Sequence, residues 1–161
     1  MAVKPTPEGY RSVTPYLICK GAAAAIDYYK KAFGATELTR HGGPDGQIGH
    51  AEIKIGDSVI MLADEFPAMQ ALSPKTIGGT PVLLLVYVTD VDAVFKRSLA
   101  AGGKQVHPLE DKFYGDRTGT LLDPFGHMWT VATHKEDVSP EEMTRRAEAA
   151  TKKATKAKKA K

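Results

Sequence analysis

The chain has 161 residues, of which 42% are hydrophobic, 25% charged and 7% aromatic, and its formal net charge is +3. This composition is typical of a globular chain with one hydrophobic core, or two small ones sharing an interface, and it excludes disordered and fibrous classes. Six lysines and no acid lie in the last eleven residues, so the first 150 residues carry a net charge of −3 and only the tail is basic.

The chain has one cysteine, Cys19, which excludes an internal disulfide and any metal site that needs two thiolates. The longest uninterrupted apolar run, Val82 to Val88, is far shorter than the roughly 20 residues that a membrane-spanning helix needs. The first ten residues contain no hydrophobic signal core. We therefore expect a cytoplasmic protein without a membrane span.

The first half of the chain predicts a strand, a helix and three more strands. Val13 to Cys19 is an apolar strand candidate. A helix is predicted in the segment that follows, AAAAIDYYKKAFG, because its apolar residues recur at helical spacing. Its last residue, Gly34, occupies the position of a C-terminal cap. Glycine-rich turns then separate the strands predicted at residues 35–41, 48–55 and 58–64.

The second half repeats this order. Residues 82–88 are predicted to form a buried strand, and Asp90 to cap a helix that ends at Gly102 and Gly103. Corresponding glycines keep a nearly constant offset, since Gly34 and Gly103 are 69 residues apart and Gly56 and Gly126 are 70 apart. Three strands complete this half, at residues 104–108, 118–122 and 127–133. The order βαβββ therefore occurs twice.

These elements divide the chain into two modules with a connection and a C-terminal extension. We expect module one at about residues 10–64, a proline- and glycine-rich connection at 65–81 and module two at about 82–134. Ser139 and the residues after it start a C-terminal helix, which runs into the lysine-rich tail within residues 137–161. Each module is too small to bury a stable core alone, so pairing within the chain or between two chains is expected.

Three segments carry a resemblance to a known family: PYLICKGAAAAIDYYKKAFGA, GHAEIKIGDSVIMLADEFP and FYGDRTGTLLDPFGHMWTVATH. With the two βαβββ modules, they resemble the vicinal-oxygen-chelate superfamily of glyoxalases, bleomycin-resistance proteins and dioxygenases, and within it the PhnB-like branch. The resemblance covers residues 10–136 and makes residues 1–136 one glyoxalase-like domain. It implies an α+β fold in which the modules curl a mixed β-sheet into a cup with helices outside, and it implies a homodimer.

The resemblance also implies metal ligands, namely His or Gln on the first strand of each module and Glu on the last. The matching positions fall near Thr14 and Leu83 on the first strands and near Ile60 and Thr130 on the last. None of these side chains supplies the imidazole or carboxylate donors of a four-ligand site. We therefore predict no metal and no other cofactor; a divalent ion would require a different alignment of the ligand positions.

Alternation along the strands assigns side chains to the cup. In residues 48–55 the apolar side chains at every second position would pack on helices, which turns His50 and Glu52 toward the cup. The same reasoning assigns Ile60 and Leu62 to the cup. Such an apolar, aromatic lining is typical of a small-molecule site. The predicted ligand-binding residues are Tyr16, Leu83, Leu85, Tyr87, Tyr114, Asp116 and Thr130.

Two groups of polar residues are candidates for catalysis. His50 and Glu52 could form a general base and its orienting carboxylate, or supply two ligands of a displaced metal site, or form a half-exposed polar face of an edge strand. Arg117 could hold an anionic ligand group, or pair with Asp116 and brace its loop. His127 is expected to be exposed in a turn.

Three functions follow from these patterns. The leading hypothesis is a dimeric protein that binds a small organic molecule in an apolar cup without the superfamily's metal. The alternative is a lyase or isomerase in which His50 moves a proton, Glu52 orients it and Arg117 holds the substrate, with or without a divalent metal. A third reading makes the lysine-rich tail a weak, salt-sensitive tether to polyanions. The chain lacks the motifs of phosphate loops, dinucleotide sites and serine hydrolases.

Overall fold

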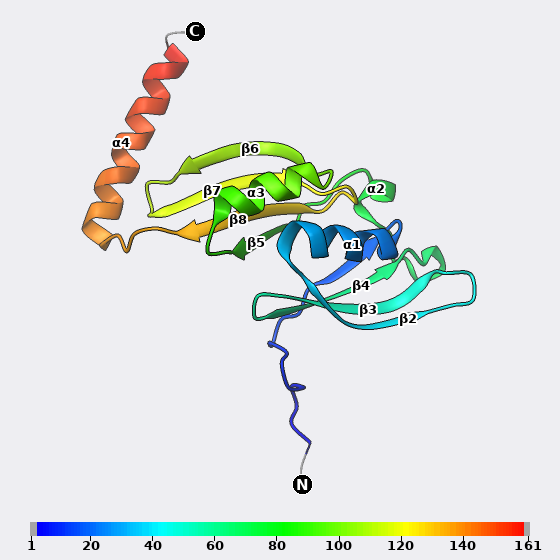
Figure 1. Cartoon of the computed structure of the whole chain (residues 1–161). Helices are drawn as coiled ribbons and strands as arrows, with labels where there is room; N and C mark the ends of the chain where they lie inside the picture. Colours follow the sequence, from blue (N-terminus) through cyan, green and yellow to red (C-terminus); the bar gives the residue numbers. More distant parts are fainter. Residues whose placement is uncertain (1–2, 160–161) are drawn as a thin grey trace.

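The computed structural model describes the backbone of residues 3–159 and the side chains of residues 3–152, and it contains two mixed four-stranded sheets (Figure 1). The strands of the first sheet are ordered β1-β4-β3-β2, and those of the second β5-β8-β7-β6. The first half of the chain consists of β1 (Tyr16–Cys19), α1 (Ala22–Phe33), β2 (Thr36–Gly42), β3 (Ile48–Ile55) and β4 (Ser58–Asp64).

The second half has the same order of elements. Between the halves lie two short turns of helix, η1 (Pro67–Met69) and α2 (Pro74–Ile77). The remaining elements are β5 (Leu83–Tyr87), α3 (Val91–Ala100), β6 (Lys104–Asp111), β7 (Asp116–Leu122), β8 (Met128–His134) and α4 (Pro140–Lys159). The predicted α+β fold with two βαβββ units is confirmed.

In each sheet the first strand lies parallel to the last strand of the same unit. Tyr16 of β1 pairs with Met61 of β4, and Leu85 of β5 pairs with Thr130 of β8. The remaining pairs in both sheets are antiparallel. Each first strand is therefore an edge strand, joined to the sheet only through the last strand of its unit.

Capping groups explain where the two core helices α1 and α3 begin and where α1 ends. Asp64, at the end of β4, accepts hydrogen bonds from the backbone N–H groups of Gly21 and Ala22 at 3.0 and 2.7 Å and so caps α1. Gly34 ends α1 in the left-handed region with φ 69°, which glycine adopts without steric cost. Asp90 caps α3 as predicted, because its side chain accepts from the Ala93 N–H at 2.9 Å.

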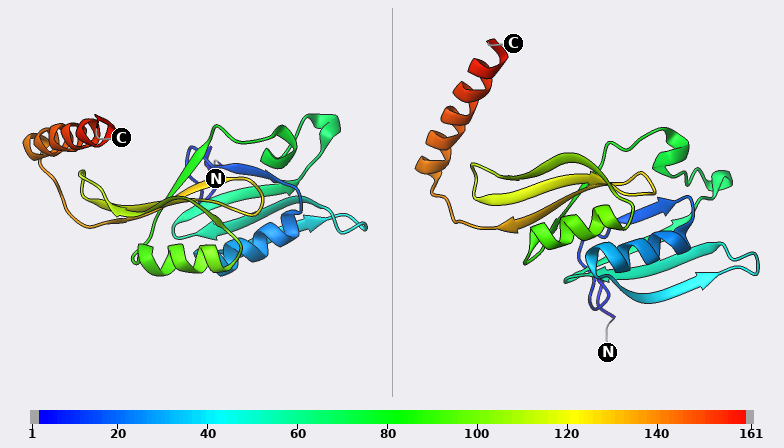
Figure 2. Two further views of the ribbon diagram at one scale, coloured as in Figure 1. Left: turned by 90° about the horizontal axis from the view of Figure 1, so that it is seen from above. Right: turned by 45° about the horizontal axis from the view of Figure 1, so that its top comes forward.

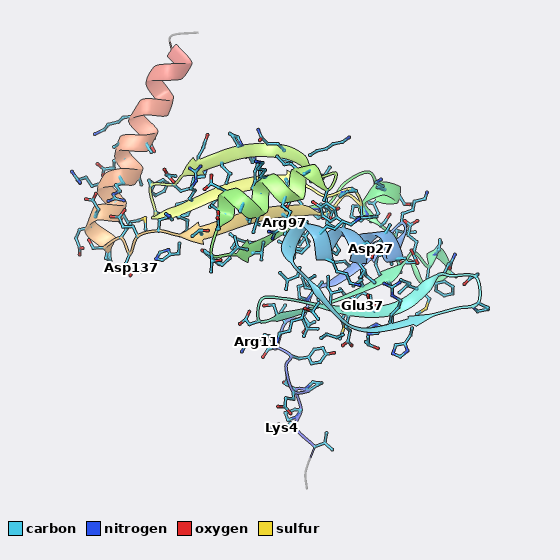
Figure 3. The ribbon with its side chains drawn as sticks, viewed as in Figure 1. Lys4, Arg11, Asp27, Glu37, Arg97 and Asp137 are labelled. Carbon is cyan, nitrogen blue, oxygen red and sulfur yellow. The ribbon has the colours of Figure 1, made fainter. Side chains whose placement is uncertain are left out.

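The helices α1 and α3 lie side by side on the same side of the two sheets and join the halves (Figure 2). Arg97 of α3 lies beside α1 (Figure 3), and its Nε donates to the Ala32 carbonyl at 3.0 Å. The Tyr28 hydroxyl donates to the Ser98 carbonyl at 3.3 Å. Both carbonyls lie near the C-terminal ends of their helices, where intrahelical partners are lacking, and the Ser98 carbonyl also accepts from the Gly103 N–H at 3.0 Å.

A buried carboxylate at the last hairpin also joins the two halves. Asp123 is 3% exposed, and it accepts hydrogen bonds from the Tyr29 hydroxyl at 2.7 Å and the Trp129 indole at 3.0 Å. The backbone N–H groups of Phe125 and His127 donate to its other oxygen. The prediction that His127 is exposed is wrong, because this carboxylate draws the turn inward and leaves His127 only 7% exposed.

The C-terminal helix α4 projects away from the sheets (Figure 1). Its start is the predicted one, since the Glu142 N–H donates to the Ser139 hydroxyl at 3.3 Å. The helix continues through Lys159, so the backbone of most of the lysine-rich tail is helical. Residues 160–161 and the tail side chains from 153 onward lie outside the described part of the chain. Among residues 3–159, no helix combines the length and apolar character needed to cross a membrane.

Candidate functional site

The faces of both sheets opposite the helices carry the predicted ligand-binding side chains. Tyr16 in β1 is 46% exposed, and Leu83, Leu85 and Tyr87 in β5 are 48%, 49% and 60% exposed. The intervening Leu84 and Val86 pack toward the core. The alternation of side chains along a strand therefore predicts the open face for these four residues. Their large apolar side chains are uncovered on that face.

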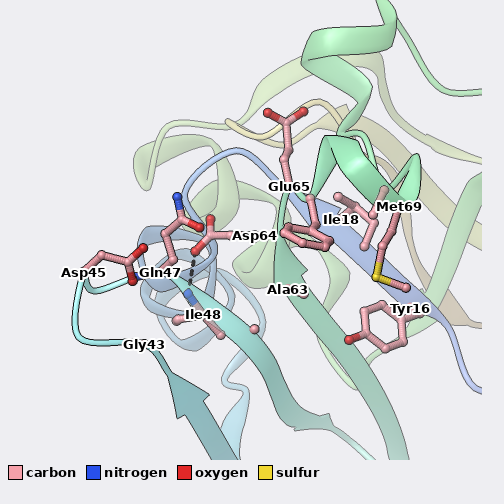
Figure 4. A pocket seen from close by; sticks show the side chains of 13 residues that line it. Tyr16, Ile18, Gly43, Asp45, Gln47, Ile48, Ala63, Asp64, Glu65 and Met69 are labelled. Atoms are coloured by element: carbon pink, nitrogen blue, oxygen red, sulfur yellow. Dashed lines mark hydrogen bonds between the residues drawn. The ribbon is translucent and has the colours of Figure 1, made fainter.

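A cavity of about 630 Å³ opens on this face of the first sheet (Figure 4). Its floor comes from β1 and β4, one wall from the turn between β2 and β3, and the other wall from the segment around η1. Of the predicted ligand-binding residues, only Tyr16 lines it. The apolar lining consists of Tyr16, Ile18, Ile48, Ala63, Phe66, Met69 and Ala71.

Sequence reasoning missed the wall formed by residues 65–71, because the Pro- and Gly-rich composition of residues 65–81 as a whole indicated only a connection. In the structure Phe66 and Ala71 exchange backbone hydrogen bonds and form a small closed loop around η1. Phe66 is 54% exposed and Met69 is 76% exposed. Two large apolar side chains, Phe66 and Met69, in a short turn-forming segment are the signal that could have found this wall.

Carboxylates line the rim of the cavity, and two of them are held by the scaffold. Besides capping α1, Asp64 accepts from the Ile48 N–H at 2.8 Å. Glu65 accepts from the Ser73 N–H at 2.8 Å, and hydrogen bonds from Thr76 and Ser73 lower the pKa of Glu65 to about 2. The rim is thus negatively charged at neutral pH, while the interior is apolar.

His50 and Glu52 lie on the open face of β3, as predicted, and form one hydrogen-bonded chain with Tyr16. His50 Nδ1 lies 3.0 Å from the Tyr16 hydroxyl, and His50 Nε2 lies 3.0 Å from Glu52 Oε1. Hydrogen bonds from Tyr10 and then from His50 lower the pKa of the Glu52 carboxyl. The side chains of His50 and Glu52 are 31% and 17% exposed.

The second sheet carries a different polar chain on its open face. The Tyr87 hydroxyl donates to Asp116 at 2.8 Å, and His134 Nδ1 lies 2.7 Å from the other oxygen of the same carboxylate. Asp116 is 5% exposed, whereas nearby Tyr114 is 38% exposed. Thr130 is also placed on this face, where its hydroxyl is bonded to that of Thr120 at 2.9 Å.

The structure does not bring Arg117 to this face. The strand β7 begins at Asp116, so Asp116 and Arg117 point to opposite sides of the sheet. The guanidinium of Arg117 donates to both oxygens of Asp92, at the start of α3, at 2.8 and 2.7 Å, and to Asp111 at 3.3 Å. The interpretation that Asp116 and Arg117 pair with each other is therefore wrong, and Arg117 does not join His50 and Glu52.

The assignment of β4 side chains to the cup was displaced by one residue. Ile60 and Leu62 are 5% and 0% exposed and belong to the core under α1. Met61, which lies directly opposite Glu52, is on the open face instead, and so is Ala63, which lines the cavity. A nearly continuous apolar strand offers no alternation from which its register can be read.

The open-face residues of the first and last strands do not fit the metal site of the superfamily that the sequence resembles. The adjacent pairs are Tyr16 with Met61 in one sheet and Leu85 with Thr130 in the other. A thioether, an alkyl chain, a phenol and a bonded hydroxyl do not provide the imidazole and carboxylate donors of a four-ligand divalent site. Among the described residues, no three His, Cys, Asp or Glu side chains gather as a metal site requires.

Comparisons with known proteins agree with this architecture. The model of the Glyoxalase/Bleomycin resistance protein/Dioxygenase superfamily matches residues 12–131. Uncharacterized protein Mb0911c of Mycobacterium bovis is 44% identical over 135 residues, which cover 82% of this chain and 89% of that protein.

Solved structures give the same result. The crystal structure of TioX from Micromonospora sp. ML1 is similar with a TM-score of 0.61 and 29% identity, covering 80% of this chain and all of that one. A structure described as a putative 3-demethylubiquinone-9 3-methyltransferase, PhnB protein, from Bacillus cereus has a TM-score of 0.60 and 20% identity, over 76% of this chain and 99% of that one. At that identity the second likeness concerns the fold alone.

Proposed function

Because the chain belongs to the glyoxalase/bleomycin resistance protein/dioxygenase superfamily, we propose that it binds a small organic molecule in the cavity of its first sheet, without a metal ion. The cavity itself carries the proposal. Its volume of about 630 Å³ lies within the range of small-molecule sites, which are concave and mostly apolar with a few polar groups. The open-face side chains of the first and last strands lack imidazole and carboxylate donors, which supports binding without a metal ion.

The binding mode follows from the lining. Tyr16, Phe66 and Met69 offer aromatic and thioether surface for an apolar or aromatic part of the ligand. The tyrosine hydroxyl and the rim carboxylates offer hydrogen bonds to its polar part. Sequestration of a drug or metabolite needs this complementarity and no reactive group.

The test is a screen of metabolites and antibiotics for ligand-dependent increases in the melting temperature. Wild type is expected to respond to at least one compound. In Ala63→Phe, the new ring occupies the cavity floor, so the response should disappear, whereas Ala100→Phe, on the exposed side of α3, should keep it. Absence of any response in wild type, or an equal response in Ala63→Phe, would contradict the proposal.

The proposal that the protein holds no metal ion is tested separately. Untagged protein is incubated with Ni, Zn, Mn or Fe(II), desalted and subjected to elemental analysis. Less than stoichiometric metal is the expected result. A stoichiometric metal would show that the ligand positions were misaligned, or that His50 and Glu52 form a displaced site.

We further propose that the protein is a cytoplasmic homodimer. The exposed side chains Leu83, Leu85 and Tyr87 form an apolar strip along an edge strand, a feature that soluble proteins commonly cover with a partner. Light scattering during gel filtration should give twice the chain mass of 17.3 kDa. Leu85→Lys should shift the mass toward the monomer, and Leu38→Lys, at a similarly exposed position in β2, should not.

A second candidate function is a lyase or isomerase that uses His50 and Glu52. The 3.0 Å contact between His50 Nε2 and the Glu52 carboxylate favours it, because a carboxylate fixes the tautomer of a histidine and strengthens it as a base. Polyanion binding by the tail remains a prediction, since most of the lysine side chains concerned lie outside the described residues.

A further inference from the structure

A second cavity, of about 710 Å³, lies at one end of the second sheet. Three segments that are distant in sequence line it: the connection at residues 74–80, the start of β6 with the turn before it, and the hairpin between β7 and β8. In Figure 1 it lies where α2 approaches the end of the second sheet. Its volume is that of a small-molecule site, and it shares no lining residue with the cavity of the first sheet.

The walls of this second cavity are in direct contact with each other. A Cβ atom added at Gly126 in the hairpin would lie 3.0 Å from the Cβ of Pro74 in the connection. Gly126 also has a φ of 94°, which glycine adopts without steric cost. The hairpin itself is held by the hydrogen bonds to Asp123. The cavity is therefore bounded by a packed junction and exists before a ligand binds.

Two lysines supply the positive charge of the second cavity. Lys75 comes from the connection and Lys104 from the start of β6, and both are exposed. Among the residues whose side chains are described, neither ammonium group has an ion-pair or hydrogen-bond partner. The third charged lining residue, Asp123, is 3% exposed, and each of its oxygens already accepts two hydrogen bonds. A bound molecule would thus meet two free ammonium groups and no free carboxylate.

The strand register places an apolar surface beside one of these lysines. Lys104 of β6 pairs with Leu122 of β7, and Leu122 pairs with Met128 of β8. Side chains of directly paired residues lie on the same face of a sheet. Leu122 and Met128 also line the second cavity and are half-buried. The cavity therefore combines a cationic end with a small apolar floor.

The two cavities differ in the sign of their charge. The charged residues that line the cavity of the first sheet are all acidic: Asp45, Asp64 and Glu65. An anion is repelled there, whereas the unpaired ammonium groups of Lys75 and Lys104 attract it to the second cavity. The two sites are therefore expected to take different classes of molecule.

We propose that the second cavity binds a small organic phosphate. Lys75 and Lys104 hold the phosphate group, and Leu122 and Met128 contact the organic part. A phosphate monoester carries a charge of about −1.5 to −2 at neutral pH, so it matches two lysines better than a carboxylate with its single charge does. Lysine binds phosphate as a point charge with three hydrogen-bond donors. Glycines at residues 78, 79, 102 and 126 leave the backbone accessible to the ligand.

The test uses pyridoxal 5′-phosphate, whose aldehyde condenses with a lysine amine and releases water. Borohydride reduces the imine to a stable adduct, which peptide mass spectrometry locates. Because one lysine of the pair holds the phosphate while the other reacts, Lys75 and Lys104 should be labelled at least about fivefold more than the exposed Lys96, the upper scale of an exposed ion pair. Pyridoxal, which lacks the phosphate, should show no such preference. Equal labelling of the three lysines by the phosphate would overturn the proposal.

Variants show whether the two lysines act as a pair. In Lys104→Gln the labelling of Lys75 should fall to that of Lys96, and in Lys75→Gln the labelling of Lys104 should fall in the same way. The matched control Lys96→Gln should leave both unchanged. Unchanged labelling of Lys75 in Lys104→Gln, with a circular dichroism spectrum like that of wild type, would contradict a shared phosphate site.

Competition distinguishes an organic phosphate from the inorganic ion. Phenyl phosphate should protect Lys75 and Lys104 from labelling at a lower concentration than inorganic phosphate, because its ring covers apolar surface at Leu122 and Met128. Equal protection by the two compounds would show that the cavity binds the ion alone, and would contradict the organic part of the proposal.

The result does not depend on ligand binding in the first sheet. Ala63→Phe, which fills the first cavity, should leave the labelling of Lys75 and Lys104 unchanged. Loss of the preference in this variant would place the phosphate in the first cavity and contradict the proposal. Selective labelling with no hit in the ligand screen would sustain the second cavity and contradict the first.

Discussion

Asp123 satisfies four hydrogen-bond donors with one side chain. Burial raises the pKa of Asp123, but hydrogen bonds from His127 and Tyr29 outweigh burial, so its pKa lies below the ordinary value and the group stays charged. Two backbone donors bind one oxygen, and the Tyr29 hydroxyl and the Trp129 indole bind the other. A buried carboxylate with this many charge-assisted bonds stabilises the hairpin strongly.

The first prediction concerns Asp123→Asn. The amide oxygen can keep the two backbone bonds, but the NH₂ group then faces two donors, so the Trp129 indole loses its acceptor. We expect a loss of about 2 kcal/mol in the free energy of unfolding, the scale of a buried unsatisfied donor. Urea unfolding measures it. Asp45→Asn, in an exposed turn where the amide oxygen can still accept from Gln47, should cost less than about 0.5 kcal/mol. Equal unfolding midpoints for the two variants would contradict this role.

Residue-level prediction from sequence succeeded where a local rule applied. The spacing of His50 and Glu52 predicted that they share a face, because side chains of a strand alternate. The contact of Tyr16 with His50 was not predictable in this way, because it depends on β4 lying between β1 and β3. The burial of His127 was missed for a similar reason, since the donors that surround Asp123 come from two distant segments.

At the scale of elements, His134 ties the end of β8 to the segment that leads into α4. Its Nδ1 lies 2.7 Å from Asp116 of β7, and its Nε2 lies 3.0 Å from Asp137. Both ring nitrogens face carboxylates, which favours the imidazolium form. Hydrogen bonds to Asp116 and then to Asp137 raise the pKa of His134 above its usual value of 6.5.

The second prediction is a pH-dependent effect of His134→Gln. A pKa raised in the folded state gives a stabilisation that is complete below the unfolded value and is lost as the pH rises through the folded value. The difference in urea midpoint between wild type and His134→Gln should therefore be largest near pH 6 and shrink as the solution becomes alkaline. His107→Gln, at an exposed histidine of β6, should show no such trend. A difference that grows toward alkaline pH would contradict the assignment.

Element boundaries were predicted well where glycine and capping residues mark them. Gly34 and Asp90 lie at the ends predicted for the two core helices. The register of β4 was not predicted, because apolar residues on both of its faces hide the alternation. The wall around η1 was missed because turn-forming composition describes a local chain path and not which cavity that path borders.

At the scale of the whole molecule, the two halves share one core. Trp129 of β8 lies against Phe33 of α1 with ring centroids 4.8 Å apart, and Tyr29 of α1 is bonded to Asp123. All three aromatic residues of α1, Tyr28, Tyr29 and Phe33, are under 8% exposed. Separation of the halves would expose these rings and break the bond from Tyr29 to Asp123.

The third prediction is a single unfolding transition. Trp129, the only tryptophan of the chain, reports on the junction of the halves, and far-ultraviolet circular dichroism reports on all elements. The two signals should give the same urea midpoint, as expected for a cooperative unit. Tyr29→Phe should lower both midpoints together, because it removes one bond to a buried carboxylate. A fluorescence change that precedes the loss of circular dichroism would show that the halves unfold separately.

The bond between Tyr29 and Asp123 also sets an order for biosynthesis. Synthesis proceeds from the N-terminus, so every strand of the first sheet leaves the ribosome before the hairpin that carries Asp123 has been made. Until then the aromatic face of α1 has no partner from β8, and the Tyr29 hydroxyl has no carboxylate to bind. The nascent first half therefore stays incompletely packed, with the aromatic side chains of α1 uncovered, until the hairpin that carries Asp123 and Trp129 has been synthesised.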